Sequence, residues 1–238
     1  YASNAVQSSF SQSYNNVYFG CGAAICAVAY LPSNAKLTNV FTFPLPGFVV
    51  DTAVALFETT FQVDHQQPAP RLLFAVAHNA SIPLADRLRA FSLGESSSSA
   101  NAQLLALQLL PAEDKVLNTS ETASIAWSYK TSSTMLSQPV IFKSTVLVLE
   151  NLSSLLCFDA FNGTLLWNYT DSSFAVFASS FSSSPTLQQQ NASFYLFIPS
   201  RAELQAIDAL TGKLQWRVTV MSQQQQTSPS SEDISQKV

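Results

Sequence analysis

The sequence predicts an all-β fold built from four-stranded antiparallel blades of a β-propeller, and a phrase that occurs twice carries most of that prediction. Residues 157–167 read C-F-D-A-F-N-G-T-L-L-W, and residues 206–216 read A-I-D-A-L-T-G-K-L-Q-W. The Asp, Gly and Trp of the two copies share a single offset of 49 positions. A repeat of about 40 to 50 residues with strand, turn and strand content is typical of propeller blades.

Composition agrees with this fold class. The chain of 238 residues is 47% hydrophobic but only 11% charged, against about 25% charged residues in an average domain. Uncharged polar residues must therefore cover much of the surface. Four blades of roughly 50 residues would fill the chain, and we expect them to span residues 17–220 after a polar N-terminal segment, residues 1–16.

The first blade matches the pattern loosely. Two apolar runs near the start could be its middle strands, residues 17–20 and 25–31, with Ser33-Asn34 as the turn. Phe41 or Phe43 would then stand where the repeated phrase has tryptophan. This unit has lost the aspartate and the glycine, so its register stays open between the two phenylalanines.

The second blade is predicted with an insertion. Residues 71–77 and 88–94 resemble the middle strands and the turn, and the last strand would follow at 125–129 with Trp127. Between them we expect a loop insertion at about 94–124. The apolar run 104–110 inside it is too short for periodicity to decide between a strand and a helical turn.

The third and fourth blades follow the pattern closely. Each has two β-branched or aromatic runs before the repeated phrase, at 138–142 and 145–149 in the third blade and at 184–187 and 194–198 in the fourth. Such runs, bounded by polar turns, indicate strands. Residues 221–238, rich in serine and glutamine, are predicted to be a disordered tail.

The repeated phrase has a physical reason for each of its fixed residues. Asp159 and Asp208 can accept backbone N–H bonds from the turn that follows, and Gly163 and Gly212 can supply the positive φ that closes it. A tryptophan offers a large apolar area where one sheet packs on the next. We therefore expect three tryptophans to be buried between sheets: Trp127, Trp167 and Trp216.

At residues 138–169 and 184–218 the chain resembles the repeat of the pyrroloquinoline-quinone (PQQ) family, the quinoprotein alcohol dehydrogenase-like β-propellers. The resemblance rests on Pro-Val, an apolar strand and then A-x-D-x-x-T-G-x-x-x-W. It implies propellers of seven or eight blades, some of which are dehydrogenases that hold PQQ with calcium, a catalytic aspartate and a Cys-Cys pair. Others bind no quinone and serve as assembly scaffolds or lumenal platforms.

Charge argues against nucleic acid as a partner. The formal net charge is −4 and the pI is about 5.0, and the few Lys and Arg residues are scattered, so there is no basic patch for phosphates. The longest apolar run, residues 21–31, is shorter than the roughly 20 residues of a membrane span. We expect neither nucleic-acid binding nor a membrane span in this chain.

Acceptor triplets for N-glycosylation suggest a secreted or lumenal location. Chance alone would give about two to three such triplets in this composition, and a serine-rich chain also forms them by accident. The six candidates are Asn79, Asn118, Asn151, Asn162, Asn168 and Asn191. Asn162 lies at the tip of a predicted hairpin, whereas Asn168 lies on a strand where it could face inwards.

The cysteines and histidines give no sign of catalysis. Cys21 and Cys26 would face opposite sides of a strand unless Gly22 bends the chain, so we expect them to be unpaired, and Cys157 takes the place of Ala206 as a small buried side chain. No Cys-x-x-Cys pair occurs, and His65 and His78 have no partner at a metal-binding spacing.

Two classes of function remain, and the residues favour the first. The chain is predicted to be a non-catalytic protein-binding or scaffold propeller without a cofactor or metal. The alternative is a fragment of a PQQ-dependent dehydrogenase with calcium, but the chain lacks the Cys-Cys pair and Asp159 and Asp208 are assigned to turns. Unless four blades close tightly on themselves, they are too few to close a ring of this family. We therefore expect an open half-ring that is either a truncated gene product or needs a second copy or another chain, and that self-associates or aggregates when expressed alone.

Overall fold

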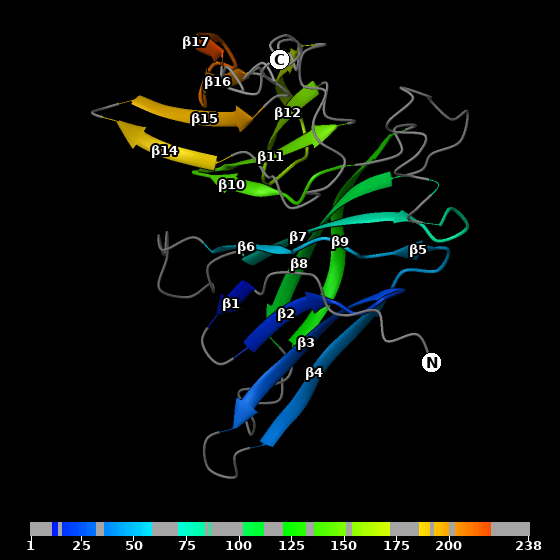
Figure 1. Ribbon diagram of the computed structural model, residues 1–238. Helices are drawn as coiled ribbons and strands as arrows, with labels where there is room; N and C mark the ends of the chain where they lie inside the picture. The colour runs from blue at the N-terminus through cyan, green and yellow to red at the C-terminus, as the bar shows by residue number, and fades with distance from the viewer. Residues whose placement is uncertain are drawn as a thin grey trace, which may run out of the picture.

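The computed structural model confirms an all-β protein with four antiparallel sheets, which we number as blades 1 to 4 (Figure 1). The sheets follow one another in an open stack from blade 1, at the lower end of Figure 1, to blade 4 at the upper end. The structure describes residues 11–13, 16–31, 36–58, 71–83, 86, 102–111, 121–131, 136–150, 154–171, 186–190, 193–199 and 203–219.

Blades 1 and 2 form the lower half of the stack. Blade 1 has the strand order β1-β2-β3-β4. Its strands are β1 (Ser11–Ser13), β2 (Asn16–Gly20), β3 (Ala24–Leu31) and β4 (Lys36–Pro44). Blade 2 has β5 (Phe48–Val49), β6 (Ala55–Glu58), β7 (Arg71–Asn79), β8 (Ala102–Pro111) and β9 (Glu121–Thr131). β5 and β6 both pair with β7, and the order continues to β8 and β9.

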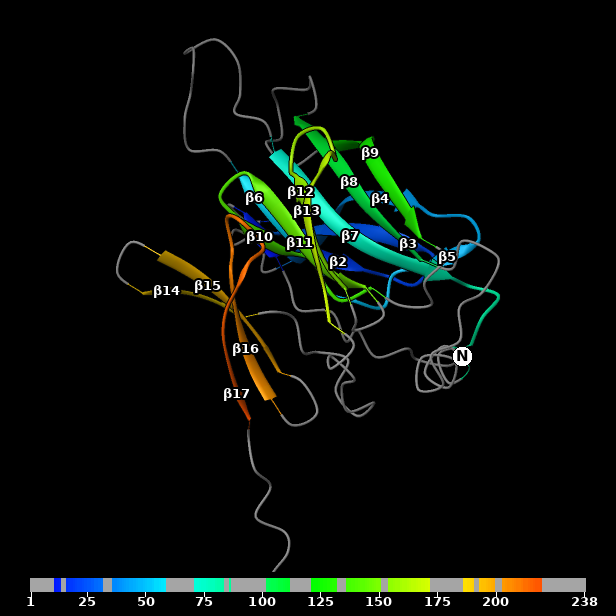
Figure 2. The ribbon, with the colours of Figure 1, turned by 90° about the horizontal axis from the view of Figure 1, so that it is seen from above.

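Blades 3 and 4 have four strands each, paired in chain order. Those of blade 3 are β10 (Val140–Phe142), β11 (Thr145–Glu150), β12 (Ser154–Asp159) and β13 (Leu165–Thr170). Those of blade 4 are β14 (Thr186–Gln190), β15 (Ser193–Pro199), β16 (Glu203–Asp208) and β17 (Leu214–Thr219). β6 of blade 2 contacts β1 of blade 1 and β10 of blade 3, so these three strands lie on one side of the stack. Figure 2 shows β6 beside β10.

One register feature recurs in all four blades. The last two strands pair across a bulge, and the residue pair just before it is Ala27 with Phe41, Ala106 with Trp127, Cys157 with Trp167 and Ala206 with Trp216. The open question about blade 1 is thereby settled, because Phe41 rather than Phe43 takes the tryptophan position.

The prediction for the third strand of blade 2 is wrong. That place belongs to β8, which pairs with β7 from Arg71 with Leu109 to His78 with Ala102, and not to residues 88–94. β8 also shows that the apolar run 104–110 is a strand. The turn Ser33-Asn34, residues 87–101 and the predicted tail lie outside the described residues.

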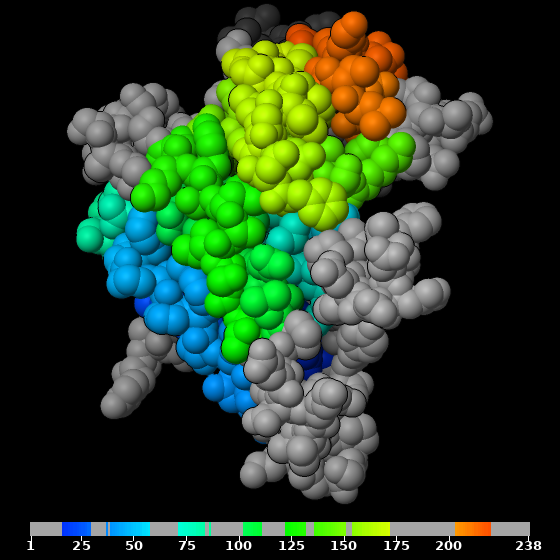
Figure 3. Space-filling view, turned by 180° about the vertical axis from the view of Figure 1, so that it is seen from behind, coloured from blue at the N-terminus to red at the C-terminus, as the bar shows by residue number. Residues whose placement is uncertain are grey.

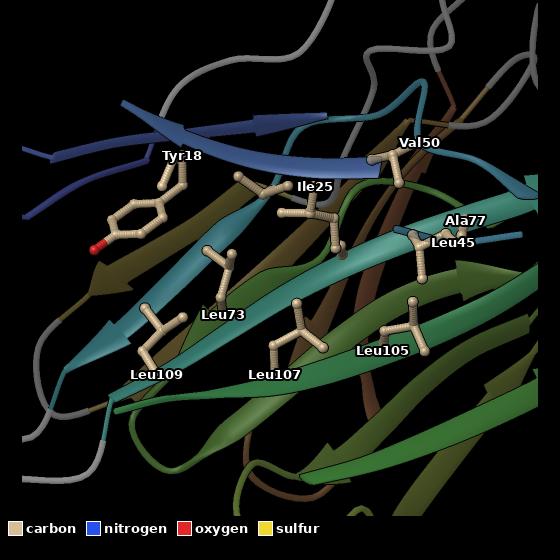
Figure 4. Packing of buried hydrophobic residues seen from close by; sticks show 12 residues of the cluster. Tyr18, Ile25, Leu45, Val50, Leu73, Ala77, Leu105, Leu107 and Leu109 are labelled. Atoms are coloured by element: carbon tan, nitrogen blue, oxygen red, sulfur yellow. The ribbon is translucent and has the colours of Figure 1, made fainter. Parts of the chain in front are cut away.

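The core consists of three apolar clusters, one at each junction between blades. Between blades 1 and 2, Tyr18 and Ile25 face Leu73, Leu105 and Leu107 (Figure 4). The Arg71 guanidinium donates a hydrogen bond of 2.7 Å to the Tyr18 hydroxyl at the same junction. Because each blade buries its faces only against a neighbour, the stability of the stack depends on these junctions, which we call seams.

Candidate interaction surface

The repeated phrase forms the hairpin turn between the last two strands of blades 3 and 4. Asp159 Oδ1 accepts the backbone N–H groups of Phe161 at 2.9 Å and Asn162 at 3.0 Å. Gly163 has a φ of +73° and donates its N–H to the Asp159 carbonyl oxygen at 3.0 Å. The Asp159 carboxylate therefore holds the turn together.

Blade 4 repeats this geometry. Asp208 Oδ1 accepts the N–H groups of Leu210 at 3.0 Å and Thr211 at 2.8 Å and also the Thr211 hydroxyl at 3.0 Å. Gly212 has a φ of +68°. The two turns, 49 positions apart, thus use an aspartate and a glycine at equivalent positions for equivalent backbone hydrogen bonds.

Each glycine turn lies under the tryptophan of the preceding blade. A Cβ built on Gly163 would lie 2.6 Å from the indole Cδ2 of Trp127, and a Cβ on Gly212 would lie 2.5 Å from the Cε3 of Trp167. The Trp127 Nε1–H also donates a hydrogen bond of 2.9 Å to the Ala160 carbonyl oxygen. Tryptophan on one blade and glycine on the next therefore form a matched contact at two seams.

Trp216 differs from the other two tryptophans. It has the same register, opposite Ala206, but 39% of it is exposed. We predicted all three to be buried between sheets, and for Trp216 this is wrong. Blade 4 is the last blade among the described residues (Figure 3). Figure 3 shows its last two strands in orange at the end of the molecule, beside β12 and β13 in yellow-green.

The outward face of blade 4 is therefore an apolar surface that reaches solvent. From the register this side of the sheet carries Leu204 and Ala206 of β16 and Trp216 and Val218 of β17. Trp216 and Val218 are exposed and Leu204 is half-buried, whereas Ala206 is fully buried. Val218 is 53% exposed, and β17 is exposed along its whole length. The residues at the same places in blade 3 are packed in the apolar cluster between blades 3 and 4: Leu155, Cys157, Trp167 and Tyr169. We call Leu204, Trp216 and Val218 the open face.

A polar cluster lies at the seam between blades 3 and 4. Gln205 is fully buried, at the repeat position of Leu156 in blade 3, and its Nε2 donates to Asp171 Oδ2 at 3.2 Å. The Tyr169 hydroxyl lies 3.2 Å from both Asp171 Oδ2 and Gln205 Oε1. Arg217 pairs with Asp171 and, at 3.4 Å, with Glu203. Burial raises the pKa of the Tyr169 phenol, and a hydrogen bond with Arg217 acts in the opposite direction by lowering this pKa.

A second buried polar group, His78, joins three segments. Its Nδ1 lies 2.6 Å from Asp51 Oδ1, and its Nε2 accepts the Leu136 N–H at 3.4 Å. Since Nε2 accepts, the geometry assigns the ring proton to Nδ1, donated to Asp51. No local sequence pattern indicates this pair, because 27 residues separate the two partners. His65 lies outside the described residues.

The cysteines require one correction. Cys21 and Cys26 form a disulfide, although alternation along a strand argued against it. Cys21 follows the end of β2, and Gly22, with a φ of +78°, turns the chain back into β3, so the alternation does not apply to Cys21. Cys157 is buried as a free thiol, and burial raises its pKa from 9.0 to about 11.

Three of the six glycosylation candidates lie in the described residues. Asn162 and Asn168 are exposed, so Asn168 does not face inwards, and Asn79 is half-buried with its Oδ1 accepting the Ser81 N–H at 2.9 Å. The Asn162 Oδ1 accepts the N–H of Thr164, the last residue of its triplet, at 2.8 Å. Asn118, Asn151 and Asn191 lie outside the described residues.

Asp159 and Asp208 are the conspicuous carboxylates, and Oδ1 of each accepts backbone N–H groups in its own turn. In the part of the chain that the structure describes, no three His, Cys, Asp or Glu side chains gather as a metal site would need. Among the same residues there is also no helix of the length and apolarity that crossing a membrane would require.

Comparison with known proteins identifies the repeat. A PQQ-repeat family model described as "Outer membrane protein assembly factor BamB" matches residues 89–238. A search of curated proteins gives no match.

Solved structures resemble the chain at low identity. A quinohemoprotein alcohol dehydrogenase from Pseudomonas putida HK5 is 9% identical with a TM-score of 0.54, covering 90% of this chain and 34% of its own. BamB from Moraxella catarrhalis is 11% identical with a TM-score of 0.49, covering 87% and 50%. Apo AztD from Citrobacter koseri is 11% identical with a TM-score of 0.43, covering 89% and 46%. The chain spans half or less of the length of these three structures.

Proposed function

The chain belongs to the PQQ-repeat family whose model is described as outer membrane protein assembly factor BamB, and on that premise we propose that it is a non-catalytic propeller module that binds protein. The observation that carries the proposal is the open face of blade 4. Val218 and Trp216 are 53% and 39% exposed. In blades 2 and 3 the equivalent side of the sheet packs against the next blade. Exposed apolar side chains on a sheet face are typical of protein interfaces.

The proposed compartment is the secretory pathway or the extracellular space. The Cys21–Cys26 disulfide supports it, because disulfides persist in oxidising compartments and are rare in reducing ones. The exposed triplet at Asn162, on the tip of a hairpin, is consistent with glycosylation there. Intact-mass analysis of the chain secreted from eukaryotic cells should find one free thiol and a glycan on Asn162. Three free thiols would contradict the proposed compartment.

We further propose that the module uses neither PQQ nor calcium. Oδ1 of Asp159 and of Asp208 already accepts two backbone N–H bonds in its turn. Equilibrium dialysis should give no saturable binding of PQQ with calcium present, and the chain should oxidise neither alcohols nor sugars. Saturable binding at micromolar PQQ would instead support the alternative, a fragment of a quinoprotein dehydrogenase.

Site-specific photo-crosslinking tests protein binding by the open face. Val218 and Ile125 are each 53% exposed and each lies on the last strand of its blade, but Val218 alone belongs to the open face. A photo-reactive amino acid at 218 should give discrete crosslinked protein species in the secreting cell, and the same amino acid at 125 should not. Equal crosslinking at both positions, or none at 218, would contradict the proposed function.

A further inference from the structure

The hairpin tip of blade 3 carries a dipeptide that occurs nowhere else in the sequence. Asn162 is followed directly by Gly163, and the 238 residues contain no other Asn-Gly pair. Blade 4 has Thr211 before Gly212 at the equivalent place. Blade 3 therefore has an amide side chain where the other copy of the repeated phrase has a hydroxyl.

An asparagine followed by glycine is prone to one reaction, because asparagine is a thermolabile residue and no Cβ on the glycine hinders the approach of its nitrogen. In this reaction the backbone nitrogen of the glycine loses its proton and attacks Cγ of the asparagine. The departing Nδ2 takes up a proton and leaves as ammonia. Water then opens the succinimide ring to aspartate or to isoaspartate, in which the main chain runs through the former side chain.

One contact in the turn of blade 3 favours this reaction. The Asn162 Oδ1 accepts the N–H of Thr164 at 2.8 Å. Negative charge develops on this oxygen when the nitrogen attacks Cγ, and a backbone N–H that already points at the oxygen stabilises that charge. Asn162 is also exposed, so the water that opens the ring can reach it.

Two other contacts oppose the reaction. The Gly163 N–H is donated to the Asp159 carbonyl oxygen at 3.0 Å, so the nitrogen that must lose its proton is engaged. The indole ring of Trp127 lies against Gly163, since a Cβ built there would be 2.6 Å from Cδ2. Its Nε1–H also donates to the Ala160 carbonyl oxygen at 2.9 Å. Blade 2 therefore holds the hairpin of blade 3 closed, and local opening of the hairpin is needed to release the nitrogen.

From this geometry we propose that Asn162 is a deamidation site whose rate is controlled by the seam between blades 2 and 3. Conversion is slow while Trp127 covers the hairpin, and it proceeds when the seam opens. Isoaspartate adds one carbon atom to the main chain of the turn, which displaces Gly163 from its place under the ring and weakens the seam. Deamidation also removes the Nδ2 that would carry a glycan, so a converted chain cannot be glycosylated at this position. The proposal is independent of protein binding by the open face.

Mass spectrometry of the unglycosylated full chain, secreted into the bacterial periplasm, tests the proposal. Brief cleavage by chymotrypsin after Phe161 and Trp167 gives the peptide 162–167, in which Asn162 is the only amide side chain. A sample taken at time zero gives the conversion that occurs during digestion. At neutral pH the chain unfolded in urea should convert many-fold faster than the folded chain. Equal rates, or no conversion in urea, would overturn the proposal.

Two substitutions separate opening of this seam from unfolding of the whole chain. Trp127→Phe removes the hydrogen bond to Ala160 and part of the ring that covers Gly163. Trp167→Phe is the matched control, because it changes the same ring contact one seam further along, over Gly212. In the folded chain Trp127→Phe should raise the conversion rate several-fold, and Trp167→Phe should leave it unchanged. An equal increase in both variants, or no increase with Trp127→Phe, would overturn control by the seam.

The converted chain tests the effect on the seam. The isoaspartate form, separated from the starting chain by ion exchange, is compared with Asn162→Asp, which carries the same charge on an unaltered main chain. The isoaspartate form should have the lower urea midpoint, because only its turn is lengthened. Equal midpoints would show that the turn accepts the additional carbon atom, and they would overturn the coupling between deamidation and the seam.

Discussion

The indole ring of Trp167 occupies the space that a side chain on Gly212 would need, since a Cβ built there would lie 2.5 Å from the ring. Gly212 also has a φ of +68°, a region that residues with a Cβ adopt at a cost of about 1–2 kcal/mol. Two independent requirements, backbone conformation and close approach of an aromatic ring, thus select glycine at the same position.

Substitution of glycine separates these two requirements. Gly212→Ala and Gly163→Ala should each destabilise the chain more than Gly47→Ala. Gly47 has a similar φ of +79°, but a Cβ there would meet nothing within 4 Å, so it reports the backbone cost alone. Urea unfolding of the three variants gives the comparison. Equal losses would show that the tryptophan rings move aside without penalty.

Truncation of the tryptophans tests the seams from the other side. Trp167→Ala should cost about 3–5 kcal/mol of unfolding free energy, the usual loss for a large aromatic residue removed from a core. Trp216→Ala is the matched control, because it has the same register with 39% exposure, and it should cost much less. A loss below about 1 kcal/mol for Trp167→Ala would place this side chain outside the core.

The sequence predicted blades 3 and 4 well because each residue of the repeated phrase has a local task. Asp159 and Gly163 act within a single turn, and such short-range requirements remain visible in the order of the residues. Blade 2 has no such phrase: its hairpin is extended past Ala106 and its third strand follows a long insertion. Nothing local distinguished residues 88–94 from β8, and only the pairing with β7 decides between them.

The candidate site was less predictable, since its features depend on contacts distant in the sequence. The pairing of His78 with Asp51 and the cluster around Gln205 join residues from different strands and blades. The Cys21–Cys26 disulfide was missed for a local reason, because Cys21 was treated as part of a strand although β2 ends at Gly20. The exposure of Trp216 could not be read from a phrase that it shares with the half-buried Trp167.

The buried thiol of Cys157 gives the stability a pH dependence. Burial raises its pKa from 9.0 to about 11 in the folded chain. Between these values the unfolded chain loses the thiol proton and the folded chain keeps it, so this contribution to stability is complete below about pH 9 and is lost as pH rises toward 11. Cys157→Ala, which copies Ala206 of the repeat, should flatten the fall in the urea midpoint over that window. An unaltered slope would show that the thiol does not titrate as proposed.

Self-association of the chain tests whether the open face forms contacts between copies. Val218 and Trp216 expose apolar area on β17, which is the last strand of its sheet among the described residues. Burying that area gains free energy in proportion to it. The isolated chain should therefore form concentration-dependent oligomers or aggregates in light scattering.

Val218→Lys should suppress these oligomers, because a lysine in the centre of such a contact must be desolvated. Ile125→Lys is the control, with the same 53% exposure on a blade whose neighbours are in place, and it should not change the association. A wild-type chain that stays a compact monomer at high concentration would count decisively against an exposed half-ring, and suppression by both lysines alike would assign the association to general hydrophobicity and not to the open face.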